Sequence, residues 1–231
     1  MNSKNYVNTC ANFIQESSCF DQLDEEEKEL VNKNQLTVDF KKGETICKQG
    51  SFASHIMYLE HGLVKVYLEG KPKNLILTIT PSKHLVGLPS VFEGNNTFLY
   101  SVSTYVDSTV NLIDVNVFKQ LLRQNANFAT KIINVLNENT AQAYGRFFCL
   151  TQKQLHGRMA DILLCLSQRI FKSPEFNLPL SRNDLGELTS MSTESVIRIM
   201  KDFKDNKLIS VSGKSIEILN FEKMLKISEV G

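Results

Sequence analysis

The chain has 231 residues, 42% of them hydrophobic, which is enough to bury two separate cores. Its formal net charge of +1 excludes a protein that holds nucleic acid through bulk positive charge alone. No apolar run approaches the roughly 20 residues that cross a bilayer, and the first residues lack the basic-then-apolar order of a secretory signal, so we expect a cytoplasmic protein with no membrane partner.

The cysteines give no sign of a disulfide framework or a metal site. They are odd in number and scattered, with no Cys-x-x-Cys pair: Cys10, Cys19, Cys47, Cys149 and Cys165. We therefore expect reduced structural thiols.

The N-terminal half changes from helical to strand patterns. Residues 1 to about 33 hold two short helical patterns, the second opened by the acidic run Asp24 to Glu27. From Leu36 to Asp114, short alternating apolar segments are separated by glycine-containing breaks. The segments are Leu36-Val38-Phe40, Ile56-Tyr58, Val64-Val66-Leu68, Leu75-Leu77-Ile79, Val102 with Val106, and Val110 to Ile113. This pattern predicts a compact antiparallel β-barrel or roll.

A long helical pattern follows a short helix that begins after Asp114. From about Asn127, apolar or small residues recur at alternating spacings of four and three, typical of a two-stranded coiled coil. The seam contains Ala129, Ile133, Leu136, Thr140, Ala143, Phe147 and Leu150. Because the chain offers no second long helix, this seam predicts a homodimer, and the alternative is that the pattern is intramolecular core. A second stripe, Ile132, Val135, Tyr144 and Phe148, is expected to pack on the roll.

The C-terminal part begins with an amphipathic helix over His156 to Phe171, followed by a loop from Ser173 to Pro179. Ser181 then has the pattern of a helix N-cap, with Asp184 three residues later. Leu185 and Leu188 supply the apolar side of this short helix.

After a turn over Thr189 to Ser192, Ser192 is expected to cap a second helix. Val196, Ile199, Met200 and Phe203 recur at helical spacing and predict the packed face. The opposite face gathers Thr193, Glu194, Ile197, Arg198 and Lys201.

This second face has the chemistry of a helix that enters the major groove of DNA. Arg198 can donate two hydrogen bonds to guanine O6 and N7, and Glu194 can accept one from cytosine N4. Lys201 and Arg182 are placed where phosphates would pass. From Lys207 to Ile218, alternating apolar residues surround Ser212-Gly213-Lys214-Ser215 and predict the hairpin of a winged helix. The alternative is a helical hairpin whose charges are merely solvated.

The predicted architecture is therefore α+β. It comprises a β-roll effector domain with N-terminal helices (1–126), a long dimerisation helix (127–154) and a winged helix-turn-helix domain (155–231). The part from Gln152 onward has 12 Lys and Arg against 10 Asp and Glu, which favours a local basic face doubled by dimerisation over nonspecific attraction.

This order of parts resembles the CRP/FNR family of bacterial transcription regulators. The resemblance depends on Lys42-Gly43-Glu44, Gly62-Leu63-Val64, the segment His156 to Ala160, and above all Ser192 to Arg198 with Asn206 to Ile209. It implies base contacts for Glu194 and Arg198. A third base-contacting position, often Arg in the family, is Thr193 here, and the position before the last Arg, Ser in the FNR branch, is Ile197.

The effector residues depart from the resemblance. Family members that bind cyclic AMP hold its phosphate with a Gly-Glu pair and an Arg-Ser pair, and these positions correspond to Gly87-Leu88 and Phe98-Leu99 here. A cyclic phosphate against Leu and Phe would lose its charge-assisted hydrogen bonds, so we expect no cyclic nucleotide.

Other cofactors have little support. The isolated Cys10 and Cys19 argue against the iron–sulfur cluster of the FNR branch. Haem stays open, because His55, His61 and His84 lie in or beside the roll.

The sequence therefore predicts a homodimeric regulator that binds a double-stranded DNA operator, with RNA polymerase as a further partner and an unknown small-molecule effector. The first alternative is a sensing module whose helix-turn-helix serves only for packing. The second is an enzyme, which the absence of metal-binding, phosphate-loop and nucleophile motifs argues against.

Overall fold

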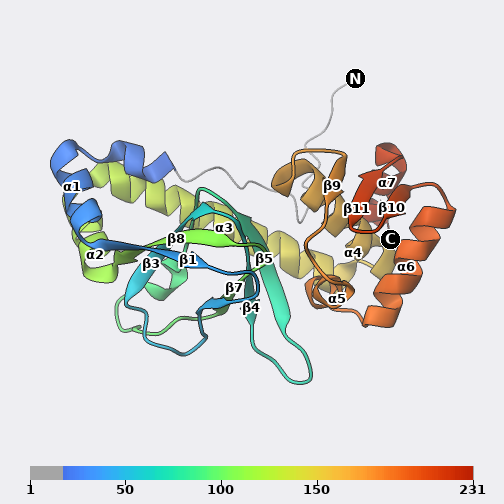
Figure 1. The fold of residues 1–231 in the computed structure, drawn as a ribbon, viewed down its shortest axis with the longest axis horizontal. Helices are drawn as coiled ribbons and strands as arrows, with labels where there is room; N and C mark the ends of the chain where they lie inside the picture. Colours follow the sequence, from blue (N-terminus) through green and yellow to red (C-terminus); the bar gives the residue numbers. More distant parts are fainter. Residues whose placement is uncertain (1–17, 231) are drawn as a thin grey trace. The chain divides into compact units, whose positions relative to one another are not determined.

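The computed structural model describes residues 18–230 (Figure 1). Contacts divide this part of the chain into two compact units, one made of residues up to 74 with 78–139, and one made of residues from 140 onward with 75–77. Cys10 and the start of the first predicted helical pattern lie outside the described residues. No helix in the described range is both long and apolar enough to cross a membrane.

The N-terminal unit is built on two four-stranded antiparallel sheets, which confirms the predicted roll. The strands are β1 (Gln35–Phe40), β2 (Thr45–Cys47), β3 (His55–His61), β4 (Leu63–Leu68), β5 (Leu75–Pro81), β6 (His84–Val86), β7 (Ser101–Thr104) and β8 (Ser108–Asp114). Their order is β1-β8-β3-β6 in one sheet and β2-β7-β4-β5 in the other. Val106 was expected in a strand but lies in the bend between β7 and β8, and the three-residue strands β2 and β6 were not predicted.

Helices cover one face of the sheet that contains β3. They are the 3-10 helix η1 (Ser18–Gln22), α1 (Glu25–Lys33), α2 (Val115–Gln124) and the start of α3 (Ala126–Gln152), and a further 3-10 turn, η2 (Leu88–Ser90), follows β6. Because side chains alternate along a strand, Ile56 and Tyr58 point to the helices whereas Met57 and Leu59 point the other way. Ile56, Ile113 and Phe118 form the core of this helix-covered face.

Helix α1 begins where its charges favour it. The Asp24 side chain accepts a hydrogen bond from Glu27 N at 2.8 Å, and Glu27 accepts one from Asp24 N at 3.0 Å, which is a complete capping box. Asp114 is the N-cap of α2, where its side chain accepts from Asn116 N at 2.7 Å and from Val117 N at 3.2 Å, without a reciprocal bond.

Helix α3 is the predicted long helix, 27 residues from Ala126 to Gln152. The second stripe was only half right. Ile132 is buried and Val135 packs against the same core, but Tyr144 is 72% exposed and Phe148 50% exposed. With 3.6 residues per turn, Phe148 lies about 160° around the helix from Ile132, so the four residues do not share one face and differ in burial.

The C-terminal unit holds the remaining elements. They are α4 (Leu155–Cys165), the π-helical turn η3 (Leu166–Ile170), β9 (Glu175–Asn177), α5 (Arg182–Thr189), α6 (Thr193–Asp205), β10 (Ile209–Ser212), β11 (Ser215–Ile218) and α7 (Phe221–Val230). The segment Ser173 to Pro179 was predicted as a loop, but its centre forms β9, which pairs with β11 through Phe176 and Ile216. Helix α7 was not predicted and packs on α4.

A buried polar cluster joins α4, α7 and the residue that follows α3. Lys153 Nζ lies 3.0 Å from Asp161 Oδ1 and donates to Ser228 Oγ at 3.1 Å, and Ser228 Oγ donates to Asp161 at 2.7 Å. The side chains of Lys153 and Asp161 are 5% and 0% exposed, so each charge depends on the other for its stability in the core.

Candidate nucleic-acid interface

Helix α5 is the first helix of the predicted helix-turn-helix. Ser181 and Asp184 form the expected capping box, with Asp184 N donating to Ser181 Oγ at 3.1 Å and Ser181 N donating to Asp184 Oδ2 at 2.9 Å. Leu185 and Leu188 are buried as predicted. The local sequence therefore determines both where this helix begins and which side it buries.

The turn between α5 and α6 is tight and depends on one glycine. Ser190 adopts a left-handed φ of 54°, and Met191 N donates to Gly186 O at 3.0 Å. A Cβ added at Gly186 would lie 2.8 Å from Met191 O, closer than van der Waals contact allows. The turn can close against α5 only because residue 186 has no side chain.

Helix α6 buries the face that periodicity predicts. Ser192 is its N-cap, accepting from Ser195 N at 3.2 Å. The inward residues Val196, Ile199, Met200 and Phe203 are all buried. The opposite face leaves Glu194, Ile197, Arg198 and Lys201 exposed and Thr193 half-buried.

The exposed face of α6 carries one charged hydrogen-bond acceptor, the Glu194 carboxylate, and two charged donors, Arg198 and Lys201. The backbone N–H of Glu194 and the Ser192 hydroxyl lower the pKa of the Glu194 carboxyl, so it is an ionised, acceptor-only group at neutral pH. Arg198 and Lys201 lie one and two turns further along the same face, exposed to solvent.

Arg182 lies at the start of α5, half-buried, and partial burial lowers the pKa of its guanidinium. The wing pairs β10 with β11 from Ile209↔Ile218 to Ser212↔Ser215, as predicted. Its tip carries exposed Lys214, whose carbonyl accepts from Leu178 N at 2.9 Å. The sequence pattern predicted the hairpin position of Lys214 but not a role for its charge.

Two arginines hold the C-terminal end of α5. Arg146 of α3 donates to Leu188 O, and Arg158 of α4 donates to Thr189 O at 3.4 Å and to Lys153 O at 2.8 Å. The last carbonyls of a helix lack partners within it, so these guanidinium groups satisfy them and position the turn.

The predicted dimer residues lie along α3 with different exposures. Ile133 is 55% and Phe147 71% exposed, Thr140 and Ala143 are exposed, and Leu136 and Leu150 are partly buried. Ile133 and Phe147 are therefore large apolar side chains that the described part of the chain leaves in solvent.

The four predicted effector residues carry no charged side chain. Leu88 and Phe98 are buried, Leu99 is 41% exposed, and Gly87 precedes η2. The Gly87 N–H donates to Tyr100 Oη at 2.9 Å, so a side chain of the protein already occupies this amide. Burial raises the pKa of Tyr100, so its hydroxyl stays neutral.

The three histidines of the roll do not converge. His55 opens β3, whereas His84 is opposite Leu59 in the register and His61 is exposed at the end of β3. Among residues 18–230, no group of three or more His, Cys, Asp or Glu side chains is arranged to hold a metal ion.

Comparison with protein families assigns both units. Residues 37–125 match the cyclic nucleotide-binding domain, and residues 157–227 match the Crp-like helix-turn-helix domain. The chain belongs to the CRP/FNR family. It is a DNA-binding transcription regulator, as the sequence predicted.

Relatives of this CRP/FNR protein align with most of its length. The transcriptional activator protein FnrA of Stutzerimonas stutzeri is 26% identical over 195 residues, which cover 78% of this chain and 75% of the relative. The fumarate and nitrate reduction regulatory protein of Vibrio cholerae is 24% identical over 227 residues, covering 96% and 87%. These relatives are transcription regulators and not enzymes, which confirms the prediction against an enzyme.

Solved structures show the same fold. FixK2 from Bradyrhizobium japonicum superposes with a TM-score of 0.77 at 18% identity, over 85% of this chain and 98% of that one. The similarity confirms the predicted α+β order of roll, long helix and helix-turn-helix.

Proposed function

We propose that this CRP/FNR regulator binds a nearly palindromic operator as a homodimer, with one α6 helix per subunit in successive major grooves. The single observation that carries the proposal is the composition of the solvent-facing side of α6. A carboxylate, an arginine and a lysine lie there on a helix whose other side is fully packed.

The residue roles follow from base chemistry. Arg198 donates to guanine O6 and N7, and ionised Glu194 accepts from cytosine N4. Ile197, 54% exposed, provides the apolar contact that a thymine methyl group prefers. Thr193 and the Ser192 cap lie at the helix end nearest the base edges, and Lys201 and Arg182 contact phosphates.

Dimerisation would supply the phosphate contacts that a net charge of only +1 does not provide. Two copies double the phosphate contacts and place half-sites about 10 to 10.5 base pairs apart. The exposed Ile133 and Phe147 of α3, with Leu136, Thr140, Ala143 and Leu150, are the proposed interface. RNA polymerase is the proposed further partner of the DNA-bound dimer.

The roll is proposed to respond to an effector other than a cyclic nucleotide held in the family's usual way. Supporting this are the apolar Leu88 and Phe98 and the Gly87 amide already bonded to Tyr100. A phosphate placed there would have to break this bond and would find no cation at these four positions.

The test begins with selection of binding sites from a random duplex library, followed by affinity measurements on the selected operator. Arg198→Ala should weaken specific binding by about 10- to 100-fold, since a bidentate base contact contributes about 1–3 kcal/mol of discrimination. Lys223→Ala, an exposed lysine of α7, removes the same charge and should change affinity little. Equal losses in the two variants would refute the assigned role of α6 and favour a helix-turn-helix used for packing.

A further inference from the structure

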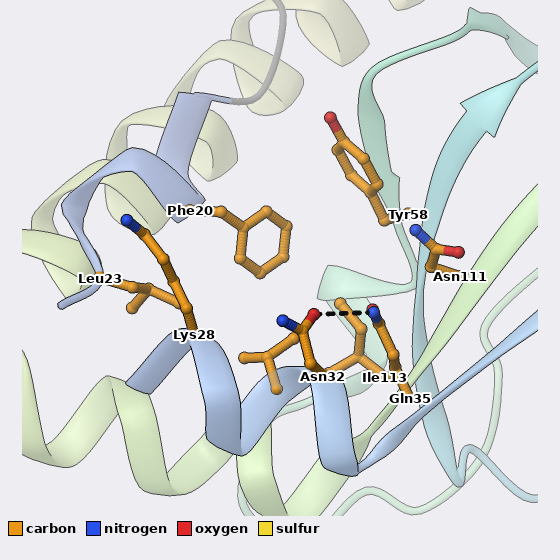
Figure 2. A pocket seen from close by; sticks show the side chains of 9 residues that line it. Phe20, Leu23, Lys28, Asn32, Gln35, Tyr58, Asn111 and Ile113 are labelled. Atoms are coloured by element: carbon orange, nitrogen blue, oxygen red, sulfur yellow. Dashed lines mark hydrogen bonds between the residues drawn. The ribbon is translucent and has the colours of Figure 1, made fainter. Parts of the chain in front are cut away.

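A cavity of about 260 Å³ lies on the helix-covered side of the roll, between η1, α1 and strands β3 and β8 (Figure 2). We propose that it binds a planar aromatic carboxylate and transmits occupancy to helix α3. Neither Gly87, Leu88, Phe98 nor Leu99 lines this cavity, so it is a site separate from the one the family resemblance indicates.

The walls of the cavity are aromatic and aliphatic. The rings of Phe20 and Tyr58 meet edge to face, with centroids 5.4 Å apart and planes at 85°. Figure 2 shows Phe20 on η1 and Tyr58 on β3 bordering the same space, with Ile113 below them in this view. A dry cavity of about 150 Å³ accepts benzene, so this larger one has room for a fused two-ring molecule.

The polar groups of the cavity favour an acceptor on the ligand. Asn32 Oδ1 already accepts from Gln35 Nε2 at 3.1 Å, and Asn111 Oδ1 accepts from Thr37 Oγ1 at 2.8 Å. The side-chain NH₂ groups of Asn32 and Asn111 are therefore the groups that can donate hydrogen bonds to a ligand.

The charge of the cavity favours an anion. None of its nine lining residues is acidic, and Lys28 is the one cation among them. Lys28 Nζ is 2.7 Å from Glu25, but with side chains 45% and 91% exposed this pair is weak, so its ammonium can also serve a ligand carboxylate.

A chain of aromatic contacts links the cavity to α3. The ring centroids of Phe20 and Phe128 are 6.0 Å apart. Those of Phe128 and Phe118 are 5.5 Å apart, in an edge-to-face contact. Phe128 is fully buried in the first turn of α3. A ligand that moves the Phe20 ring therefore changes the packing of the N-terminal end of the proposed dimer helix. This regulatory part rests on the proposed function, whereas the binding part does not.

Binding is tested by calorimetric titration of the full chain with 2-naphthoate in the absence of DNA. Lys28→Gln should weaken 2-naphthoate about fivefold, as expected for loss of one partly exposed charged contact, but should leave the neutral 2-naphthamide unchanged. The matched control is Lys33→Gln, which removes an exposed lysine of α1 that pairs with Glu29 and does not line the cavity.

A second pair of variants tests the location without depending on charge. Asn32→Trp should fill the cavity and abolish binding of both probes, whereas Lys33→Trp should not. A dissociation constant for 2-naphthoate above about 1 mM in the parent protein, or equal affinity in Asn32→Trp and Lys33→Trp, would overturn the site.

The regulatory part is tested by operator affinity with and without saturating 2-naphthoate. We expect a change of at least about fivefold in the parent protein and none in Asn32→Trp. Binding of 2-naphthoate without any change in operator affinity would overturn the coupling alone. A chain that binds 2-naphthoate but no operator would instead count against the proposed function.

Discussion

At the scale of single residues, exposure on α6 is decided by what the neighbouring residues bury. Glu194 and Arg198 are in solvent because Val196 and Ile199, on the opposite side of the helix, are completely buried. Lys153 shows the reverse case, in which a charged group that prefers water is held inside the core, and buried thiols are kept from ionising. The properties of those buried groups can be measured directly.

Cys47 should be chemically inert in the folded protein. Burial raises the pKa of its thiol from 9.0 to about 12, so at pH 8 its reactive thiolate is roughly a thousandfold scarcer than in the unfolded chain. Iodoacetamide labelling followed by mass spectrometry should therefore modify Cys47 only after denaturation. Because only the unfolded chain ionises this thiol above about pH 9, the same shift lowers stability as the pH rises further. Equal labelling rates in the native and denatured protein would contradict the assignment.

Lys153→Met should destabilise the C-terminal unit by about 3–5 kcal/mol, because it leaves the Asp161 carboxylate buried without its cation. Urea unfolding measures this loss. Lys226→Met, at an exposed position of α7, should have little effect. Adding Asp161→Leu to Lys153→Met should restore most of the stability, and a double variant no more stable than the single one would argue against the ion pair as the cause.

At the scale of elements, local signals predicted those parts of the fold that local forces determine. The caps Ser181 and Ser192 and the period of the apolar residues were sufficient for α5 and α6. Strand β9 is only Glu175–Asn177, too short for an alternation to show, and exists because β11 supplies its hydrogen bonds. The cavity beside Phe20 was also missed, since its walls come from η1, α1, β1, β3 and β8, which only the fold brings together.

One methyl group added at residue 186 should disrupt the turn of the helix-turn-helix. Gly186→Ala would gain up to about 1 kcal/mol from helix propensity, but the contact of the new Cβ with Met191 O should turn this into a loss of about 1–3 kcal/mol. Thermal unfolding and operator affinity should both fall. Stabilisation by Gly186→Ala would show that the turn does not need the glycine.

At the scale of the whole molecule, the account depends on two copies acting together. Sequence periodicity indicated the seam of α3, and the exposed Ile133 and Phe147 are consistent with a surface completed by another chain. The second stripe expected on this helix was not one face, since Ile132, which is buried, and Phe148, which is 50% exposed, lie on nearly opposite sides of α3.

Phe147→Glu should weaken the proposed dimer. It removes a large apolar contact and places two carboxylates across the symmetry axis, raising the dimer dissociation constant by more than about tenfold. Size-exclusion chromatography with light scattering measures the mass. Asn134→Glu, at an exposed position on another face of α3, should remain dimeric. A parent protein that is monomeric at all concentrations would remove the basis for paired half-sites.

The most direct measurement of the central claim replaces the operator guanine assigned to Arg198 by 7-deazaguanine, which lacks the N7 acceptor. The account predicts that this replacement weakens the parent protein about five- to tenfold but has no effect on Arg198→Ala, because the lost acceptor has no partner in the variant. Equal weakening of both proteins would contradict base recognition by the exposed face of α6.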